Sequence, residues 1–294
     1  MPGAVNIYEA WPKGLTVSKM IPTRYALFIV MYSLLAPGST HADSMVNIRI
    51  GGTGSAMGAF KHLAEAFQKI RPDIEITLIP NLGSSGAIKA LQADALELAL
   101  SARGLKSGEH ALHAEELGRT PLVIATGMYN PISVLSLEKL ARVLEGKLTT
   151  WPDGRPLRLI LRPESDSETV YLRAISPRME RAVAAAHARR GLHVALTDQD
   201  AANALEKIPG AIGLSTLALI VSEQRKLKPL ALDGKQPSLA TLARGEYPYF
   251  KPVFAITPAR PSAAATAFIA FVKSRQGKQV LAANGYLPNP AASP

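Results

Sequence analysis

The chain has 294 residues, of which 47% are hydrophobic and 19% charged, and its formal net charge is +10. This length can bury a large core and build two lobes, although length alone does not separate one domain from two. The positive charge favours an anionic partner. Lys and Arg are scattered and aromatic residues make up only 6%, so nucleic acid is a poor candidate. The absence of cysteine excludes disulfides, thiolate catalysis and cysteine-ligated metals.

The amino end has the pattern of a secretory signal. Lys19 and Arg24 precede an apolar run at 25–35, and small residues surround Thr40 and Ala42. We therefore expect a signal peptide over 1–42, with Met20 as an alternative start, and an exported, periplasmic mature chain from Asp43. An uncleaved membrane anchor is the alternative, although the apolar run is short for a bilayer span.

After Asp43 the pattern alternates between strands and helices, which predicts an α/β fold with largely parallel sheets. In the first set we expect strands at 46–50, 74–79, 96–100 and 122–126, with helices near 60–67 and 88–95. A second set contains a helix at 137–145, a strand at 157–161, helices at 169–175 and 178–190, and a strand at 211–215. A third part, 247–288, shows a strand and two helices, and we expect it to pack against an earlier set.

The first strand-to-helix junction is rich in glycine. The stretch "GGTGSAMG" at 51–58 places Thr53 and Ser55 among four glycines, so the backbone can turn tightly and present N–H groups where the helix begins. It lacks the Gly-Lys-Ser/Thr of a P-loop and misses the dinucleotide fingerprint by one residue. A nucleotide site is therefore unsupported.

A second junction, "NLGSSGAIKAL" at 81–91, places Ser84 and Ser85 between two glycines before another helix. It lacks the G-x-S-x-G order of a nucleophile elbow, which disfavours a hydrolase. An ordinary helix N-cap is the plain alternative.

A third junction, "LRPESDSETVYL" at 161–172, ends a strand with Arg162 and enters a helix through Ser165, Asp166 and Ser167. Ser101 and Arg103 follow the strand at 96–100 in the same way. Open α/β sheets bind ligands at the carboxyl ends of their strands, so these junctions are expected to meet at one site.

The junctions share hydrogen-bond donors and lack a general base. None of them contains a histidine, and the H-x-x-H of His110 and His113 has no evident third ligand for zinc. Hydroxyls, helix-start amides and guanidinium groups suit an oxyanion. We therefore expect binding rather than catalysis, with neither a metal nor a cofactor.

These residues resemble the periplasmic phosphate-binding proteins, the substrate-binding subunits of phosphate ABC transporters. The resemblance spans 46–288. Its markers, in chain order, are "GGTGSAMGAF", "GSSGAIKAL", "LALSARGLK", "NPISVLSLEKLARVLEGKLTTWPDG", "LRPESDSET", "GAIGLST", "LDGKQPS", "YPYFKPVFAIT" and "GYLP".

The resemblance implies a two-lobed type II periplasmic binding protein whose lobes close over one oxyanion. Lobe 1 would comprise 43–126 plus 247–294, and lobe 2 would comprise 127–246. The family implies a monomer that delivers its ligand to a membrane permease. The ligand-binding residues carried over by motif are Ser55, Ala56, Met57, Ser84, Ser85, Ser101, Arg162, Ser165, Asp166 and Ser167.

One departure bears on selectivity. Where the family has Asp directly after the serine that matches Ser101, this chain has Ala102. A carboxylate there accepts the proton of hydrogen phosphate and repels sulfate. Asp166 is a candidate replacement, with Glu164 and Glu168 as alternatives. Sliding the first motif by one residue moves the hydroxyl contact from Ser55 to Thr53.

Three alternatives to phosphate uptake remain open on the sequence. Sulfate, molybdate or another tetrahedral anion would be the ligand if no carboxylate faces the pocket. The same fold also serves as an anion sensor or accessory protein. A phosphoester hydrolase using a loop serine is disfavoured because no base or metal ligand accompanies the serines.

Overall fold

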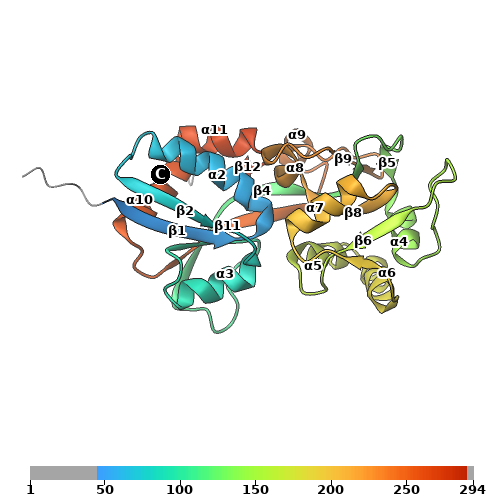
Figure 1. Ribbon diagram of the computed structural model, residues 1–294, viewed down its shortest axis with the longest axis horizontal. Helices are drawn as coiled ribbons and strands as arrows, with labels where there is room; N and C mark the ends of the chain where they lie inside the picture. The colour runs from blue at the N-terminus through green and yellow to red at the C-terminus, as the bar shows by residue number, and fades with distance from the viewer. Residues whose placement is uncertain (1–44, 290–294) are drawn as a thin grey trace, which may run out of the picture. The chain divides into compact units, whose positions relative to one another are not determined.

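The computed structural model describes residues 45–289, and the expected signal peptide lies outside them. The first set of elements comprises β1 (Val46–Gly52), α2 (Gly54–Gln68), β2 (Ile74–Ile79), α3 (Gly83–Gln92) and β3 (Leu98–Ser101). β1 pairs in parallel with both β2 and β3. Helix α2 begins directly after β1, so the glycine-rich junction lies at the carboxyl end of a buried strand (Figure 1).

The second set begins with a long strand, β4 (Leu112–Gly127). It continues through β5 (Val134–Leu135), α4 (Leu137–Leu144), β6 (Arg158–Leu161), α5 (Ser167–Arg173), α6 (Pro177–Ala188) and β7 (His193–Val194). It ends with α7 (Asp198–Lys207), β8 (Ala211–Thr216), α8 (Leu217–Ser222), β9 (Leu227–Pro229), β10 (Ala231–Leu232) and α9 (Leu239–Ala243). β6 pairs in parallel with β7 and β8.

The last elements return to the first set. They are β11 (Phe250–Pro258), α10 (Ala263–Lys273), α11 (Arg275–Ala283) and β12 (Leu287–Pro288). The main sheet has the order β2-β1-β3-β11-β4-β8-β6-β7, with β9 and β12 also paired to β4. Strand β4 pairs with β11 over 112–121 and with β8 over 122–126, so this one strand joins two halves of the sheet.

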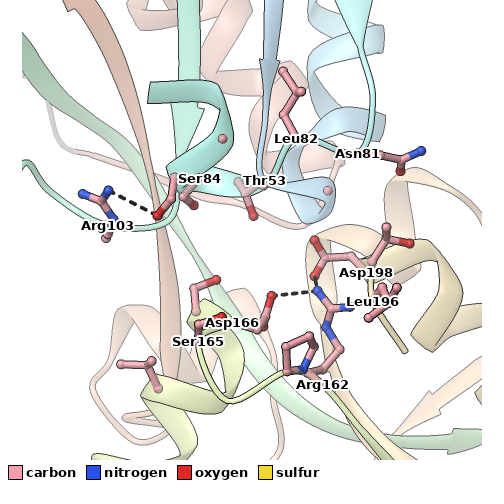
Figure 2. Close-up of a pocket in the computed structure, with 18 of the residues that line it drawn as sticks. Thr53, Asn81, Leu82, Ser84, Arg103, Arg162, Ser165, Asp166, Leu196 and Asp198 are labelled. Atoms are coloured by element: carbon pink, nitrogen blue, oxygen red, sulfur yellow. Dashed lines mark hydrogen bonds and ion pairs between the residues drawn. The ribbon is translucent and has the colours of Figure 1, made fainter. Parts of the chain in front are cut away.

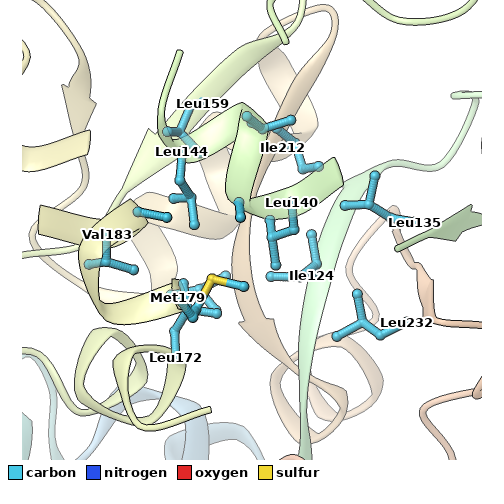
Figure 3. Packing of buried hydrophobic residues seen from close by; sticks show 14 of the residues in the cluster. Ile124, Leu135, Leu140, Leu144, Leu159, Leu172, Met179, Val183, Ile212 and Leu232 are labelled. Atoms are coloured by element: carbon cyan, nitrogen blue, oxygen red, sulfur yellow. The ribbon is translucent and has the colours of Figure 1, made fainter. Parts of the chain in front are cut away.

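Each half has its own apolar core. In the second half, Leu140 and Leu144 of α4 meet Met179 and Val183 of α6 and the strand residue Ile124 (Figure 3). The amphipathic spacing of α4 explains this, because its apolar positions fall on one face while Ser136 caps its start by accepting from the Lys139 amide at 3.1 Å.

In the first half, the returning segment supplies part of the core. Phe268 of α10 is buried between Phe60 and Phe67 of α2, with ring centroids 6.3 and 5.3 Å away and edge-on geometry. The expected return of the third part of the chain onto an earlier set is confirmed.

The α/β class and the parallel strand-helix units are confirmed, and the central strands β4 and β11 run antiparallel to their neighbours. The first ten residues of β4 were not expected as a strand, because "LHAEELGRTP" alternates poorly and ends in proline. Within residues 45–289, no helix is long and apolar enough to cross a membrane.

Candidate functional site

A cavity of about 510 Å³ opens where the strand-to-helix junctions of both halves meet. The junctions before α2 and α3 form one side of it, and the loops before α5 and α7 form the other (Figure 2). Among its lining residues are Thr53, Gly54, Asn81, Leu82, Gly83, Ser84, Ser85, Gly86, Arg103, Lys106, Arg162, Pro163, Ser165, Asp166, Ser167, Val170, Tyr171, Leu196, Thr197, Asp198 and Gln199.

Six of the ten residues named from sequence line this cavity: Ser84, Ser85, Arg162, Ser165, Asp166 and Ser167. Ser55, Ala56, Met57 and Ser101 do not. Thr53, the alternative at the first junction, does line it, and its hydroxyl lies 3.2 Å from that of Ser55. The structure therefore brings all three junctions together, with a different selection of atoms at the first.

Arg162 is the central cation of the site, and its side chain is only 3% exposed. It follows β6 directly. Its Nη1 donates to the Ala195 carbonyl at 2.8 Å, and its Nη2 donates to Asp166 Oδ2 at 2.7 Å. The guanidinium is thus held by two hydrogen bonds and lies beside the cavity (Figure 2).

A second cation lies behind the first. Lys251 of β11 is 1% exposed, and its Nζ lies 3.0 Å from Glu168 Oε1 and 3.5 Å from Asp198 Oδ1. Asp198 Oδ1 also lies 3.6 Å from Arg162 Nη2. Two cations and three carboxylates, counting Asp166, therefore form one buried network.

The carboxyls of this network differ in pKa. Burial raises the pKa of Glu168 to about 8, despite the nearby Lys251. Burial also acts to raise the pKa of Asp198, but Lys251 and Arg162 outweigh it and lower the pKa. Burial therefore favours the protonated form of Glu168, whereas the two cations favour the ionised form of Asp198.

Hydrogen bonds join the serines at the start of α3 to the loop that follows β3. Ser84 Oγ accepts from the Ala102 amide at 2.8 Å, and Arg103 Nη2 donates to Ser85 Oγ at 3.3 Å. Ser101 is buried, and its hydroxyl donates to the Arg103 carbonyl at 2.6 Å. This hydrogen bond stabilises the turn of the loop between Ser101 and Arg103.

Carboxylates facing the cavity include Asp166, the candidate named from sequence, and Asp198. Glu168 is buried, and Glu164 is not among the lining residues. Ala102 is buried, and its carbonyl accepts from the Tyr171 hydroxyl at 2.6 Å.

Sequence reasoning missed Asp198, Gln199 and Lys251. The stretch "LTDQDAANAL" has the capping box of a helix start, with Thr197 and Asp200 bonded reciprocally, but nothing in it points to a ligand. Lys251 lies in a strand between Phe250 and Pro252, and only its full burial marks it.

The groups that line the site are of the kinds that bind an anion. Guanidinium, hydroxyl and amide groups from four loops converge on one space. In the part of the chain that the structure describes, no group of three His, Asp or Glu side chains is arranged to hold a metal ion. Six of the residues named from sequence line this space.

Comparison with known proteins agrees with this fold. A model of the PBP superfamily domain matches residues 37–276, which is most of the chain. The chain belongs to the PBP (periplasmic binding protein) superfamily. The phosphate-binding protein PstS of Bacillus subtilis (strain 168) is 22% identical over 255 residues, which cover 82% of this chain and 80% of that protein.

Solved structures show the same two-lobed fold. A protein from Clostridium perfringens, assigned as a phosphate ABC transporter substrate-binding protein and containing phosphate, aligns with a TM-score of 0.71 and 19% identity, covering 83% of this chain and all of that one. An ABC-type phosphate transport receptor from Vibrio cholerae aligns with a TM-score of 0.59 and 21% identity, with the same coverage. The expected fold family is therefore confirmed.

Proposed function

We propose that this protein is an extracytoplasmic solute-binding protein that captures phosphate for uptake through the membrane permease of an ABC transporter. The observation that carries the proposal is the buried Arg162, held by its neighbours beside a cavity lined by Ser84, Ser85 and the start of α3. A fixed guanidinium, hydroxyls and helix-start amides are the donors that a tetrahedral oxyanion requires.

The names of the relatives support the choice of phosphate and of transport. We propose lobes of 43–126 plus 247–294 and of 127–246, with β4 and β11 between them. Binding would favour the closed arrangement of the lobes and so present a distinct form to the permease. The signal peptide at 1–42 would direct the chain out of the cytoplasm, and the protein would act as a monomer without turnover of its ligand.

Asp166 supplies the selectivity in this proposal, in place of the acidic residue that the family has at Ala102. One oxygen of its carboxylate is bonded to Arg162, and the side chain borders the cavity. Hydrogen phosphate has a proton to donate to such a carboxylate, whereas sulfate has none at neutral pH.

Calorimetric titration of the mature chain, stripped of bound anion, with phosphate, sulfate and molybdate at neutral pH tests this function. We expect binding of phosphate and no heat from sulfate. Tighter binding of sulfate or molybdate would contradict the phosphate assignment and leave an oxyanion carrier. Silence toward all three anions would contradict the function itself.

Replacing Arg162 by Gln should weaken phosphate binding about ten-fold or more, because a charge-assisted bond is lost while most of the side-chain volume stays. Arg158→Ala is the control, since Arg158 begins the strand β6 that Arg162 follows, is exposed and donates to the Pro209 carbonyl. Equal affinity in the wild type and Arg162→Gln, with both folded by circular dichroism, would show that the anion binds elsewhere.

A further inference from the structure

The carboxylate of Asp198 reaches the first turn of helix α2. Its Oδ2 accepts from the Ser55 amide at 3.1 Å, while Oδ1 lies 3.6 Å from Arg162 Nη2 and 3.5 Å from Lys251 Nζ. In Figure 2 the side chain lies beside the Arg162 guanidinium and below Thr53, at the edge of the cavity. One carboxylate thus contacts a helix-start amide and two cations.

These three groups are of the kinds that bind an oxyanion: an N–H at a helix start, a guanidinium and an ammonium. Asp198 is 7% exposed, and its Oδ1 has no hydrogen-bond partner within residues 45–289. A buried oxygen without a partner is costly. Asp198 therefore engages the donors incompletely.

The approach of Asp198 to α2 depends on Gly54. A Cβ at position 54 would lie 2.5 Å from Asp198 Oδ2 and 2.7 Å from Gln199 Oε1, too close for either. Gln199 Nε2 also donates to the Gly54 carbonyl at 3.1 Å. The absence of a side chain at Gly54 therefore lets the start of α7 pack against the start of α2, and this packing holds the Asp198 carboxylate beside the Ser55 amide.

We propose that Asp198 is an internal competitor for the anion: its carboxylate occupies donors of the binding site in the empty protein and gives them up when the ligand binds. This inference rests on the proposed function. It makes Asp198 a residue that sets affinity and specificity.

The competition follows from charge and geometry. Ser55 N–H and the Arg162 edge can serve the carboxylate or an incoming anion, and two anions held side by side repel each other. A ligand with only two oxygens, such as acetate, can do no more than replace the contacts that the Asp198 carboxylate already makes. A tetrahedral oxyanion has further oxygens for Ser84 and the start of α3, so Asp198 selects against small carboxylates.

The test is titration of Asp198→Asn with phosphate and with acetate. The amide keeps the shape of the side chain and removes its charge. We expect phosphate to bind at least ten-fold more tightly than to the wild type, and acetate to bind the variant and not the wild type. Asp200→Asn is the control, because Asp200 lies in the same helical turn, is exposed and does not line the cavity, so it should change the affinity by less than about three-fold.

The outcomes separate this inference from the function on which it rests. If the wild type binds phosphate and Asp198→Asn binds it equally or more weakly, the inference is overturned and the function stands. If neither protein binds any oxyanion, both are overturned.

A measurement on the wild type covers the case in which the variant does not fold. The Ser55 amide proton should shift on phosphate addition in an NMR titration, since its acceptor changes from the carboxylate to the ligand. A Ser55 amide that stays unchanged at saturating phosphate would overturn the inference.

Discussion

Burial favours the protonated form of the Glu168 carboxyl in the folded chain. Burial raises its pKa to about 8, whereas a solvated glutamate titrates near 4.5. Between these two values the folded chain binds more protons than the unfolded one, so stability falls as the pH rises. The contribution of neutral Glu168 is complete below about pH 4.5 and is lost as the pH rises through about 8.

We therefore expect Glu168→Gln to flatten the decline of the melting temperature between pH 6 and pH 9, because the amide cannot ionise. Thermal melts at half-unit pH steps measure this, with the exposed Glu164→Gln as the control. Parallel pH profiles for Glu168→Gln and the wild type would mean that Glu168 is already ionised at neutral pH, paired with Lys251.

At this scale, sequence predicted part of the site. Arg162, Ser84 and Asp166, which line the cavity, were named because each lies at the end of a strand pattern, where α/β folds place ligands. Asp198 and Lys251 were not named, because their partners lie at least 36 and 53 residues away and nothing in their local pattern indicates a pocket. Ser55 was named for its hydroxyl, whereas the structure uses its amide to bind Asp198.

At the scale of elements, the end of β1 is shaped by close contact between backbones. Gly52 lies beside Leu100 of β3, and the Gly52 Cα faces the Leu100 carbonyl so closely that a Cβ would overlap the oxygen. The Thr53 amide then donates to the same carbonyl at 2.9 Å. This contact positions the start of α2 beside the cavity.

Gly52→Ala should therefore lower the free energy of unfolding by about 1–3 kcal/mol or more, the usual cost of overpacking, since the clash is with backbone. Gly104→Ala is the control, because nothing lies within 4 Å of a Cβ there. Urea denaturation measures both, and equal midpoints would show that β1 and β3 can separate at little cost.

The glycine-rich stretch was correctly predicted as a strand followed by a helix. That its turn presents N–H groups to the ligand stays a prediction. The structure adds two further roles for its glycines: Gly52 allows the strands to approach and Gly54 admits Asp198, which only the packing of distant segments could reveal.

At the scale of the whole molecule, the last part of the chain completes the core of the first half. Phe268 is fully buried against Phe60 and Phe67 of α2, more than 200 residues earlier in the chain. Alternation of strands and helices predicted this return in general terms, since a strand and two helices cannot bury their apolar faces alone. Which strand receives β11 could not be predicted, because pairing depends on contacts far apart in sequence.

Phe268→Ala should lower the free energy of unfolding by about 3–5 kcal/mol, the usual cost of removing a buried aromatic ring.

The same variant separates the effect on stability from the effect on phosphate binding. Ligand at 100 times its Kd stabilises a folded protein by about 2.7 kcal/mol. Phosphate should add that increment to Phe268→Ala as to the wild type, because Phe268 does not line the cavity, whereas Arg162→Gln at the same phosphate concentration should lose about half of it or more. Chemical denaturation with and without phosphate measures both quantities. If Phe268→Ala lost the increment as well, the core of the first half and the anion site would be energetically coupled, and the binding energy would depend on how α2 is held against α10.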